Sequence, residues 1–284
     1  MVVGKWVTAG LDPDIYIDIS EEDDPVRPIL TLEIYNGGPQ DLYIKLEAEG
    51  PEEWAFTPVE LGLFKAGEKR TVTVEGWAER PLPGTELTET ITLHLKCYTD
   101  SAYTDYLGEV RQSLNVHFID LEAMMVVDDD DFDTNTEGWS AGSLASDHYV
   151  TPPKSLRYSK TVVQENEPVD ECNVLGVPVK INKSFTIPDA SEAYVSLYVR
   201  FTHSELWSEI SLVERYVAVK VNGKTVLYAT EPDKWYKVVT PVPVNTNVTV
   251  EVEARVAVHV DVSHTTPDCL ELHYWLDHVR VRYR

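Results

Sequence analysis

Apolar and polar residues alternate with a period of two along most of this 284-residue chain. The apolar positions are rich in β-branched and aromatic residues, and helical spacing is nowhere sustained over a dozen residues. The pattern therefore predicts an all-β protein. Strands are expected at 15–19, 29–35, 42–48, 70–77, 89–98 and 112–121, and further on at 155–158, 179–187, 193–201, 216–221, 224–228, 236–239, 248–262 and 270–283.

Turn residues separate these segments. Asn36-Gly37-Gly38-Pro39 and Ala66-Gly67-Glu68 supply residues that accept positive φ or fix φ. Asn222-Gly223 lies between two alternating runs and predicts a hairpin with a type I′ turn. Six or seven short strands within about 110 residues are typical of an immunoglobulin-like sandwich, so we expect one in the first part of the chain.

Several segments of the first part together resemble one family of domains. They are Leu30 to Asn36 with Gly37-Gly38, then Pro51, Trp54 and Pro58, and Leu63 to Glu68 before Thr71-Val72-Thr73-Val74. This arrangement resembles the CARDB and NPCBM-associated Ig-like domains, although Ala66 stands where the family often has proline. The resemblance covers residues 12 to 122 and implies a spacing or adhesive role, as in exported and surface proteins of archaea and bacteria.

A second domain is expected after the apolar run that ends at Val127, where four consecutive aspartates begin. We predict domains at 1–123 and 124–284. The second resembles jelly-roll carbohydrate-binding modules and their galactose-binding-like relatives, and the polar stretch 161–176 departs from that pattern. The resemblance rests on Asp131-Phe132-Asp133, Glu137-Gly138-Trp139-Ser140, Lys154-Ser155-Leu156-Arg157-Tyr158 and Leu276-Asp277-His278-Val279-Arg280-Val281.

The second resemblance also implies a structural Ca²⁺ ion. Carried over, its ligands are Asp133, a backbone carbonyl at Lys154 or Ser155, and Asp277, with Asp131 as a further oxygen donor from the acidic run. A buried carboxylate such as that expected for Asp277 is costly unless it is paired or bound to metal. The alternative is a solvated acidic linker in which Asp277 pairs with Arg280 or Arg157.

Histidine and cysteine offer further candidates. His259 and Asp261, with His264, Asp268 and His273 nearby, contain ligand types that zinc accepts, and a polar outer strand face explains them equally. Cys172 and Cys269 either form a disulfide or remain free thiols. Cys97 is expected to be a buried small hydrophobe.

Charge and composition exclude several classes of protein. The chain carries 48 acidic against 24 basic residues, a net charge of −24, which argues against nucleic-acid binding. No apolar run approaches the roughly 20 residues needed for membrane insertion. Residues 1 to 10 lack the apolar core of a signal peptide, so we expect a soluble chain whose export signal was removed or never existed. Scarce Gln, Cys and Met suggest a thermophilic, archaeal origin or simply an acidic β protein.

The sequence holds no P-loop and no G-x-G-x-x-G, and its Ser, His and Asp residues are scattered along the chain. We therefore predict that the protein is not an enzyme. Trp207, Trp235 and Tyr236 lie in loop or strand-edge contexts where rings can stack on a sugar, and core packing is the alternative. Trp139 is expected in the core. A cluster of tyrosines is expected in the first domain, formed by Tyr98, Tyr103 and Tyr106.

These observations favour a non-catalytic extracellular or cell-surface protein that binds a polysaccharide or other glycan, or adheres, through a calcium-stabilised jelly-roll domain. The alternative is a structural subunit of a filament, sheath, surface layer or virion, in which copies of the chain contact one another. A third reading is the accessory part of a glycosidase. An exposed aromatic platform beside a groove favours the first. A free N-terminal segment at Val2 to Thr8, able to pair with another sheet, favours the second.

Overall fold

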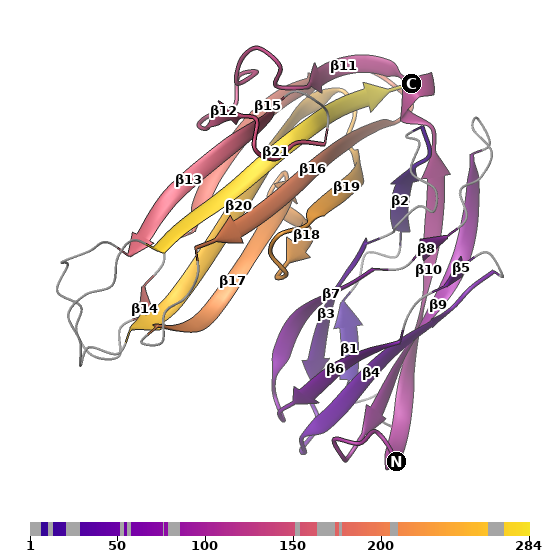
Figure 1. The fold of residues 1–284 in the computed structure, drawn as a ribbon. Helices are drawn as coiled ribbons and strands as arrows, with labels where there is room; N and C mark the ends of the chain where they lie inside the picture. Colours follow the sequence, from indigo (N-terminus) through magenta and orange to yellow (C-terminus); the bar gives the residue numbers. More distant parts are fainter. Residues whose placement is uncertain are drawn as a thin grey trace. The chain divides into compact units, whose positions relative to one another are not determined.

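The computed structural model describes residues 7–10, 14–20, 29–51, 54–55, 58–75, 77–78, 86–150, 154–163, 174–175, 178–204, 210–260 and 270–284. Strands dominate this part of the chain, and its only helical segment is a short 3-10 turn at Leu121–Ala123. The predicted all-β class is confirmed (Figure 1). Two compact units divide the chain, unit 1 at Met1–Met124 and unit 2 at Met125–Arg284. None of the described segments is a helix long and apolar enough to cross a membrane.

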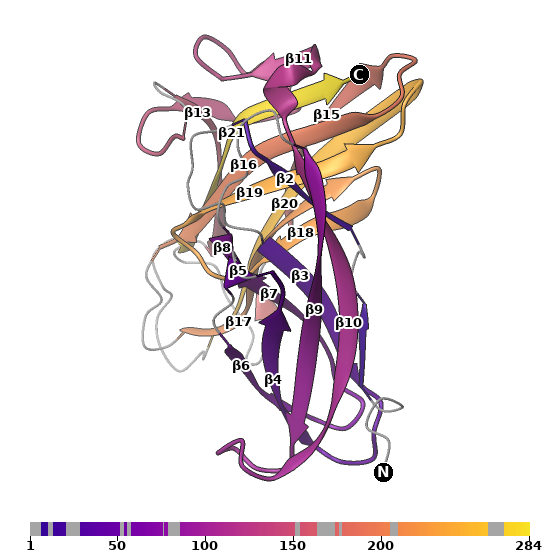
Figure 2. The same ribbon diagram turned by 90° about the vertical axis from the view of Figure 1, so that its right-hand side faces the viewer.

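Unit 1 contains two main sheets and a small two-stranded ribbon (Figure 2). The three-stranded sheet has the order β1-β3-β7, and the five-stranded sheet has the order β2-β10-β9-β4-β6. Strand β2 runs parallel to β10, and the other described pairings are antiparallel. The strands are β1 Val7–Gly10, β2 Asp14–Asp18, β3 Ile29–Asn36, β4 Leu42–Glu49, β5 Trp54–Ala55, β6 Val59–Phe64, β7 Lys69–Glu75, β8 Trp77–Ala78, β9 Leu87–Tyr98 and β10 Tyr106–Ile119.

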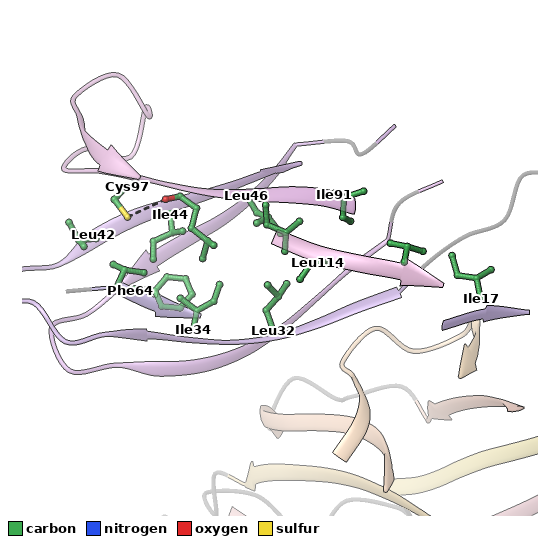
Figure 3. Packing of buried hydrophobic residues seen from close by; sticks show 14 of the residues in the cluster. Ile17, Leu32, Ile34, Leu42, Ile44, Leu46, Phe64, Ile91, Cys97 and Leu114 are labelled. Atoms are coloured by element: carbon green, nitrogen blue, oxygen red, sulfur yellow. Dashed lines mark hydrogen bonds between the residues drawn. The ribbon is translucent and has the colours of Figure 1, made fainter. Parts of the chain in front are cut away.

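The core of unit 1 lies between its two sheets (Figure 3). Alternate residues of β9, from Ile91 to Cys97, are fully buried and belong to the same cluster as Leu32 and Ile34 of β3. Cys97 donates a weak hydrogen bond to the carbonyl of Leu95, and burial raises the pKa of its thiol to about 12. The prediction that Cys97 is a buried small hydrophobe is confirmed.

Asn36 joins the two turns that carry the first family resemblance. Its side chain is fully buried, and its amide nitrogen donates to the carbonyls of Gln40, Phe64 and Lys65 at 3.0 to 3.2 Å. Its amide oxygen accepts the backbone N–H of Gly38. One side chain therefore satisfies backbone groups in two loops that are nearly thirty residues apart, which explains the asparagine at the end of β3.

Replacing Asn36 with alanine is expected to lower the unfolding free energy by about 2–3 kcal/mol, because several buried backbone groups lose their partners. The exposed Asn115, whose amide donates to Asp14 and accepts from the hydroxyl of Thr90, provides the control Asn115→Ala. Scanning calorimetry of the full chain measures both variants. Equal effects of the two substitutions would show that the Asn36 contacts are not important for stability.

Unit 2 is built from two larger sheets, in which every described pairing is antiparallel. The first, here called the β21 sheet, has the order β12-β13-β21-β16-β19, with β11 also paired to β21. The second, the β20 sheet, has the order β14-β20-β17-β18, with β15 also paired to β20. The strands are β11 Met125–Asp130, β12 Ser143–Ala145, β13 Ser155–Val163, β14 Val174–Leu175, β15 Val179–Ile187, β16 Ala193–His203, β17 Ile210–Val221, β18 Lys224–Ala229, β19 Trp235–Val242, β20 Thr246–Val260 and β21 Leu270–Tyr283.

The core of unit 2 follows the predicted alternation. Val248, Val250 and Val252 share one face of β20 and are fully buried. Asn222 and Gly223 have φ of 49° and 80°, as a type I′ hairpin requires. The predicted central strand and the predicted hairpin are therefore both observed.

The acidic run after Val127 differs from the expected solvated linker. Asp128 to Asp130 belong to β11, which pairs with β21, and Asp130 is fully buried. Lys183 lies 2.6 Å from one oxygen of Asp130 and 2.9 Å from Asp128, and the indole N–H of Trp139 donates to Asp130. Burial raises the pKa of Asp130 to about 6. The carboxylates are tolerated in a strand because a lysine and an indole neutralise and solvate them. Trp139 is 5 % exposed, as predicted for a core residue.

Candidate functional site

Strand β21 changes its neighbour half-way along one edge. Residues 270–276 pair with β13, and residues 279–283 pair with β11. On its other edge β16 follows β21 nearly throughout, with a register shift between Ser196 and Tyr198. His278, at the changeover, has φ of +48°. The preceding residue, Asp277, therefore lies at the end of the pairing with β13 on one side and, on the other, pairs with Tyr198 next to the register shift.

Asp277 is fully buried although its side chain lies on the face of the β21 sheet opposite the core residue Leu276. Its two oxygens accept the backbone N–H groups of Val150 and His278, at 2.6 and 2.8 Å. The hydroxyl of Ser155, next to it in the sheet, donates to the carbonyl of His148. Through these hydrogen bonds, the two side chains hold residues 146–150, here called the platform loop, against the outer face of the sheet.

Beside this loop, one transverse row of side chains crosses the outer face of four strands. Trp235 of β19 lies opposite Arg200 of β16, which lies opposite Trp275 of β21, which lies opposite Arg157 of β13. The guanidinium carbons of Arg157 and Arg200 are 5.6 and 6.0 Å from the centre of the Trp275 ring. Trp275 is 2 % exposed, whereas Trp235 is half-buried. We call these four residues the platform row.

The platform loop completes the site. The indole N–H of Trp275 donates to Asp147 at 3.1 Å, and the ring of His148 meets Trp275 edge-on. Burial acts to raise the pKa of Asp147, but the Trp275 hydrogen bond and the charge of Arg157 outweigh it and hold the pKa below the usual range. A pocket of about 370 Å³ opens here. Its lining consists of Ser143, Leu144, Ala145, Ser146, Asp147, Arg157 and Ser159.

His273 is a titratable residue that contacts two residues of the pocket lining, Arg157 and Ser159. Its Nδ1 lies 3.1 Å from a terminal nitrogen of Arg157 and 2.7 Å from the hydroxyl of Ser159. A guanidinium can only donate, so Nδ1 must accept, and the ring is neutral with its proton on Nε2 toward Glu271 at 3.0 Å. Burial lowers the pKa of His273, and the charge of Arg157 lowers it further.

The outer face of the β20 sheet, on the other side of unit 2, differs from the outer face of the β21 sheet. Its polar side chains form ion pairs and hydrogen bonds with one another. Glu253 on the β20 sheet is paired with Lys180 and Lys220 and accepts the hydroxyl of Tyr216. Burial acts to raise the pKa of Glu253, but these three hydrogen bonds outweigh it and hold the pKa at about 2. A face of this kind has little hydrogen-bonding capacity left for a ligand, so we place the candidate site on the β21 sheet.

The predicted ligand-binding residues have different environments. Trp235 belongs to the platform row, whereas the adjacent Tyr236 points to the core side, is 3 % exposed and donates its hydroxyl to the carbonyl of Glu231. Trp207 lies outside the described residues. We did not predict Trp275, Arg157, Arg200 or Asp147 as site residues, because their proximity depends on the pairing of strands that are far apart in the chain.

Of the predicted calcium ligands, Asp277 and Ser155 contact the platform loop. Asp131 is exposed and accepts the backbone N–H of Asp133, whose carbonyl accepts the amine of Lys154. One carboxylate oxygen of Asp133 is buried and has no hydrogen-bond partner among the described residues. The same residues include no group of three or more Asp, Glu, His or Cys side chains placed to hold a metal.

Other predicted features have clear positions. Tyr98 contacts Tyr103 and Tyr106 edge-on at 5.4 and 5.6 Å, so the expected tyrosine cluster forms in unit 1. Of the histidines considered for zinc, His273 is engaged with Arg157. The side chains of His259, Asp261, His264 and Asp268, and both Cys172 and Cys269, lie outside the described residues.

No family model matches the chain, and no curated protein matches it. Among solved structures, the CBM22-1 xylan-binding domain of Xyn10C from Paenibacillus barcinonensis is 16% identical with a TM-score of 0.31, covering 56% of this chain and 95% of that one. The tandem CBM22-1-CBM22-2 domain of the same protein is 12% identical with a TM-score of 0.30, covering 98% and 93%.

A calcium-binding mutant of β-glucuronidase 2 from Bacteroides uniformis is 11% identical with a TM-score of 0.25, covering 99% of this chain and 30% of that one. Structures similar to this chain thus include carbohydrate-binding domains. At these TM-scores the likeness carries no conclusion about a ligand or an activity.

The neutral state of His273 predicts a pH dependence of stability. The pKa of this histidine is lowered in the folded state from the ordinary value of 6.5, so the unfolded chain binds more protons in the window below that value. Stability contributed by neutral His273 is therefore present above about pH 6.5 and is lost as the pH falls through the folded-state pKa.

We expect His273→Gln to weaken this loss when melting of unit 2 is followed from about pH 7 down to about pH 5. The control is His117→Gln, which changes a histidine of unit 1 paired with Asp14. An identical pH profile for wild type and His273→Gln would contradict the assignment of the proton.

Proposed function

We propose that unit 2 is a non-catalytic glycan-binding domain that uses the platform row and the adjacent pocket. The observation that carries the proposal is the half-buried Trp235 in register with two arginines beside a polar pocket. Aromatic rings offer an apolar surface to the face of a sugar, and a few placed polar groups fix its orientation. We retain the expectation of an extracellular or cell-surface location, where a polysaccharide ligand is accessible.

The pocket suits a ligand rich in hydroxyl groups. Asp147 is an acceptor, Arg157 is a donor, and the Ser143 and Ser159 hydroxyls can do either. Its volume of about 370 Å³ is at the lower end of the roughly 300–1,000 Å³ typical of ligand pockets. An open, polar pocket favours a polar ligand lying on the surface over an apolar molecule enclosed within the fold.

Assembly through protein contacts is the competing interpretation, and its strongest sequence argument was a free strand near the N-terminus. Within that segment, Val7 and Thr8 belong to β1 and pair with Asn36 and Tyr35 of β3. The residues from Val2 to Trp6 lie outside the described part of the chain. The paired portion is therefore not a free strand, and no second observation favours assembly over glycan binding.

Replacing Trp235 with alanine is expected to weaken retention on a polysaccharide affinity gel by about tenfold or more, because the exposed part of the ring supplies the stacking surface. Trp207→Ala tests the remaining predicted tryptophan in the same assay. Tyr106→Ala removes a ring that is 52 % exposed in unit 1 and is the matched control. Unchanged retention of Trp235→Ala on a gel that binds the wild type would contradict this site.

We further propose a structural Ca²⁺ ion beside the platform loop, held by Asp133 and Asp277. The buried oxygen of Asp133 without a described partner supports this placement, because such an oxygen is costly unless a proton or a cation meets it. With at most two carboxylates, the remaining oxygen ligands would be backbone carbonyls and water, which Ca²⁺ accepts. Bound there, the ion would offset the negative charge beside the platform loop.

If the ion binds only the folded state, excess Ca²⁺ should stabilise unit 2 by about 2.7 kcal/mol at a hundredfold excess over Kd. Scanning calorimetry with EGTA and with Ca²⁺ measures the shift, and Mg²⁺ is the control for general screening. Asp133→Asn is expected to abolish the response. A melting transition of unit 2 that Ca²⁺ leaves unmoved would refute the calcium proposal without affecting the glycan proposal.

A further inference from the structure

The two arginines of the platform row are arranged for recognition of charge rather than for packing alone. Both guanidinium groups lie near the ring of Trp275, one from each neighbouring strand, and that ring is almost completely buried. Cation–π contact keeps such a guanidinium group in place without using its N–H donors. Trp275 is therefore a support for Arg157 and Arg200, and the groups presented to a ligand are the arginines and Trp235.

The hydrogen bonds of Arg157 leave part of its capacity unused. Its Nε donates to Ser159 at 3.1 Å, one terminal nitrogen to Asp147 at 3.3 Å, and the other to His273 at 3.1 Å. A guanidinium has five N–H donors, so two remain beyond these contacts. Arg157 is thus engaged mainly in shaping the pocket wall, and it can still donate to a hydroxyl group inside it.

Arg200 is less engaged than Arg157. Its contact with a carboxylate is to Asp233, at 3.5 Å, and the Asp233 side chain is 63% exposed. The Nε of Arg200 is buried and has no hydrogen-bond partner among the described residues. An ion pair at this distance with an exposed carboxylate contributes little, and a competing carboxylate can replace that partner. Arg200 lies directly opposite Trp235 in the sheet, and its terminal nitrogens, held by this weak ion pair, are the donors for which a ligand carboxylate can compete.

A carboxylate is the group that best matches the terminal nitrogens of a weakly paired guanidinium, because their planar fork binds its two oxygens in parallel. Building on the glycan-binding function proposed above, we infer that the site selects an acidic polysaccharide, in which a uronate ring stacks on Trp235 and its carboxylate pairs with Arg200. The neighbouring sugar then reaches the pocket, where Asp147, Ser159 and Arg157 bind its hydroxyls.

The net charge of the chain determines the ionic strength at which binding of an acidic polysaccharide should be measured. A net charge of −24 repels a polyanion at long range, and salt screens that repulsion beyond about 8 Å at 0.15 M. The contact with Arg200 is short-range and partly buried, since its side chain is 17% exposed, so it is screened much less. Binding is therefore best measured at physiological ionic strength.

The experiment compares acidic polysaccharides with their carboxyl-reduced derivatives, which have the same backbone without the charge. Polygalacturonate and polyglucuronate, each with its neutral counterpart, are tested by affinity electrophoresis and calorimetry on the full chain. We expect wild type to bind at least one acidic polymer about tenfold or more tightly than its neutral counterpart. Arg200→Gln should bring that ratio close to one, whereas Trp235→Ala should weaken both members of the pair.

Two further variants separate recognition from folding. Arg200→Lys keeps the charge but lacks the fork, so we expect an intermediate ratio, and it serves as the readout if Arg200→Gln does not fold. Arg111→Gln removes an arginine of unit 1 that is 68% exposed and should leave the ratio unchanged. Equal binding of acidic and neutral polymers, insensitive to Arg200, overturns the inference and leaves glycan binding intact. Failure of every polymer to bind in either form overturns both.

Discussion

A buried carboxylate at an interruption of the sheet is the constraint on which the candidate site depends. Asp277 lies where the strand paired with β21 changes from β13 to β11. An ionised carboxylate buried there needs hydrogen-bond donors close by. Two backbone N–H groups donate hydrogen bonds to the carboxylate, one from its own strand and one from Val150. Since the second belongs to the platform loop, satisfying the carboxylate also places Asp147 and His148 against Trp275. Loop position and site geometry are thus set by one electrostatic requirement.

The distribution of charge in unit 2 follows a similar logic. On the β20 sheet, Glu253 and its lysines neutralise one another. At the edge of the sandwich, Lys183 meets two aspartates of β11. On the β21 sheet, in contrast, the carboxylate that Arg200 faces among the described residues is 3.5 Å away on a largely exposed side chain. An acidic chain has few arginines, so one that is left largely unpaired beside an aromatic ring is a distinctive feature of this surface.

Local sequence pattern was sufficient to predict most strands. The expected bounds 179–187 and 270–283 coincide with β15 and β21, because period-two alternation over a buried face is a local property. The local pattern did not predict β11, because consecutive aspartates indicate a solvated segment. Their burial depends on the distant Lys183 and on pairing with β21. The same limit applies to the site. Trp235 was predicted, but its neighbour Tyr236 points to the opposite side of the strand, and a pattern without known register does not say which face is open.

The residues Trp275, Arg157 and Arg200 were missed for a related reason, since cross-strand register alone brings them together. A signal did exist. His273, Trp275 and Asp277 alternate with Leu272, Tyr274 and Leu276, so both faces of that strand carry large or functional side chains, which is unusual for a strand with one solvated face.

The direction of the platform row has a consequence for the length of what it can hold. The row runs across the strands rather than along them, so its reach is a multiple of the strand spacing. From Trp235 to Arg157 it crosses three spacings, about 14 Å in all, which is longer than a single sugar ring. Among the described strands, β19 is the last of its sheet on that side. A chain molecule lying on the row can continue past this edge, which suits internal stretches of a polymer as well as its ends.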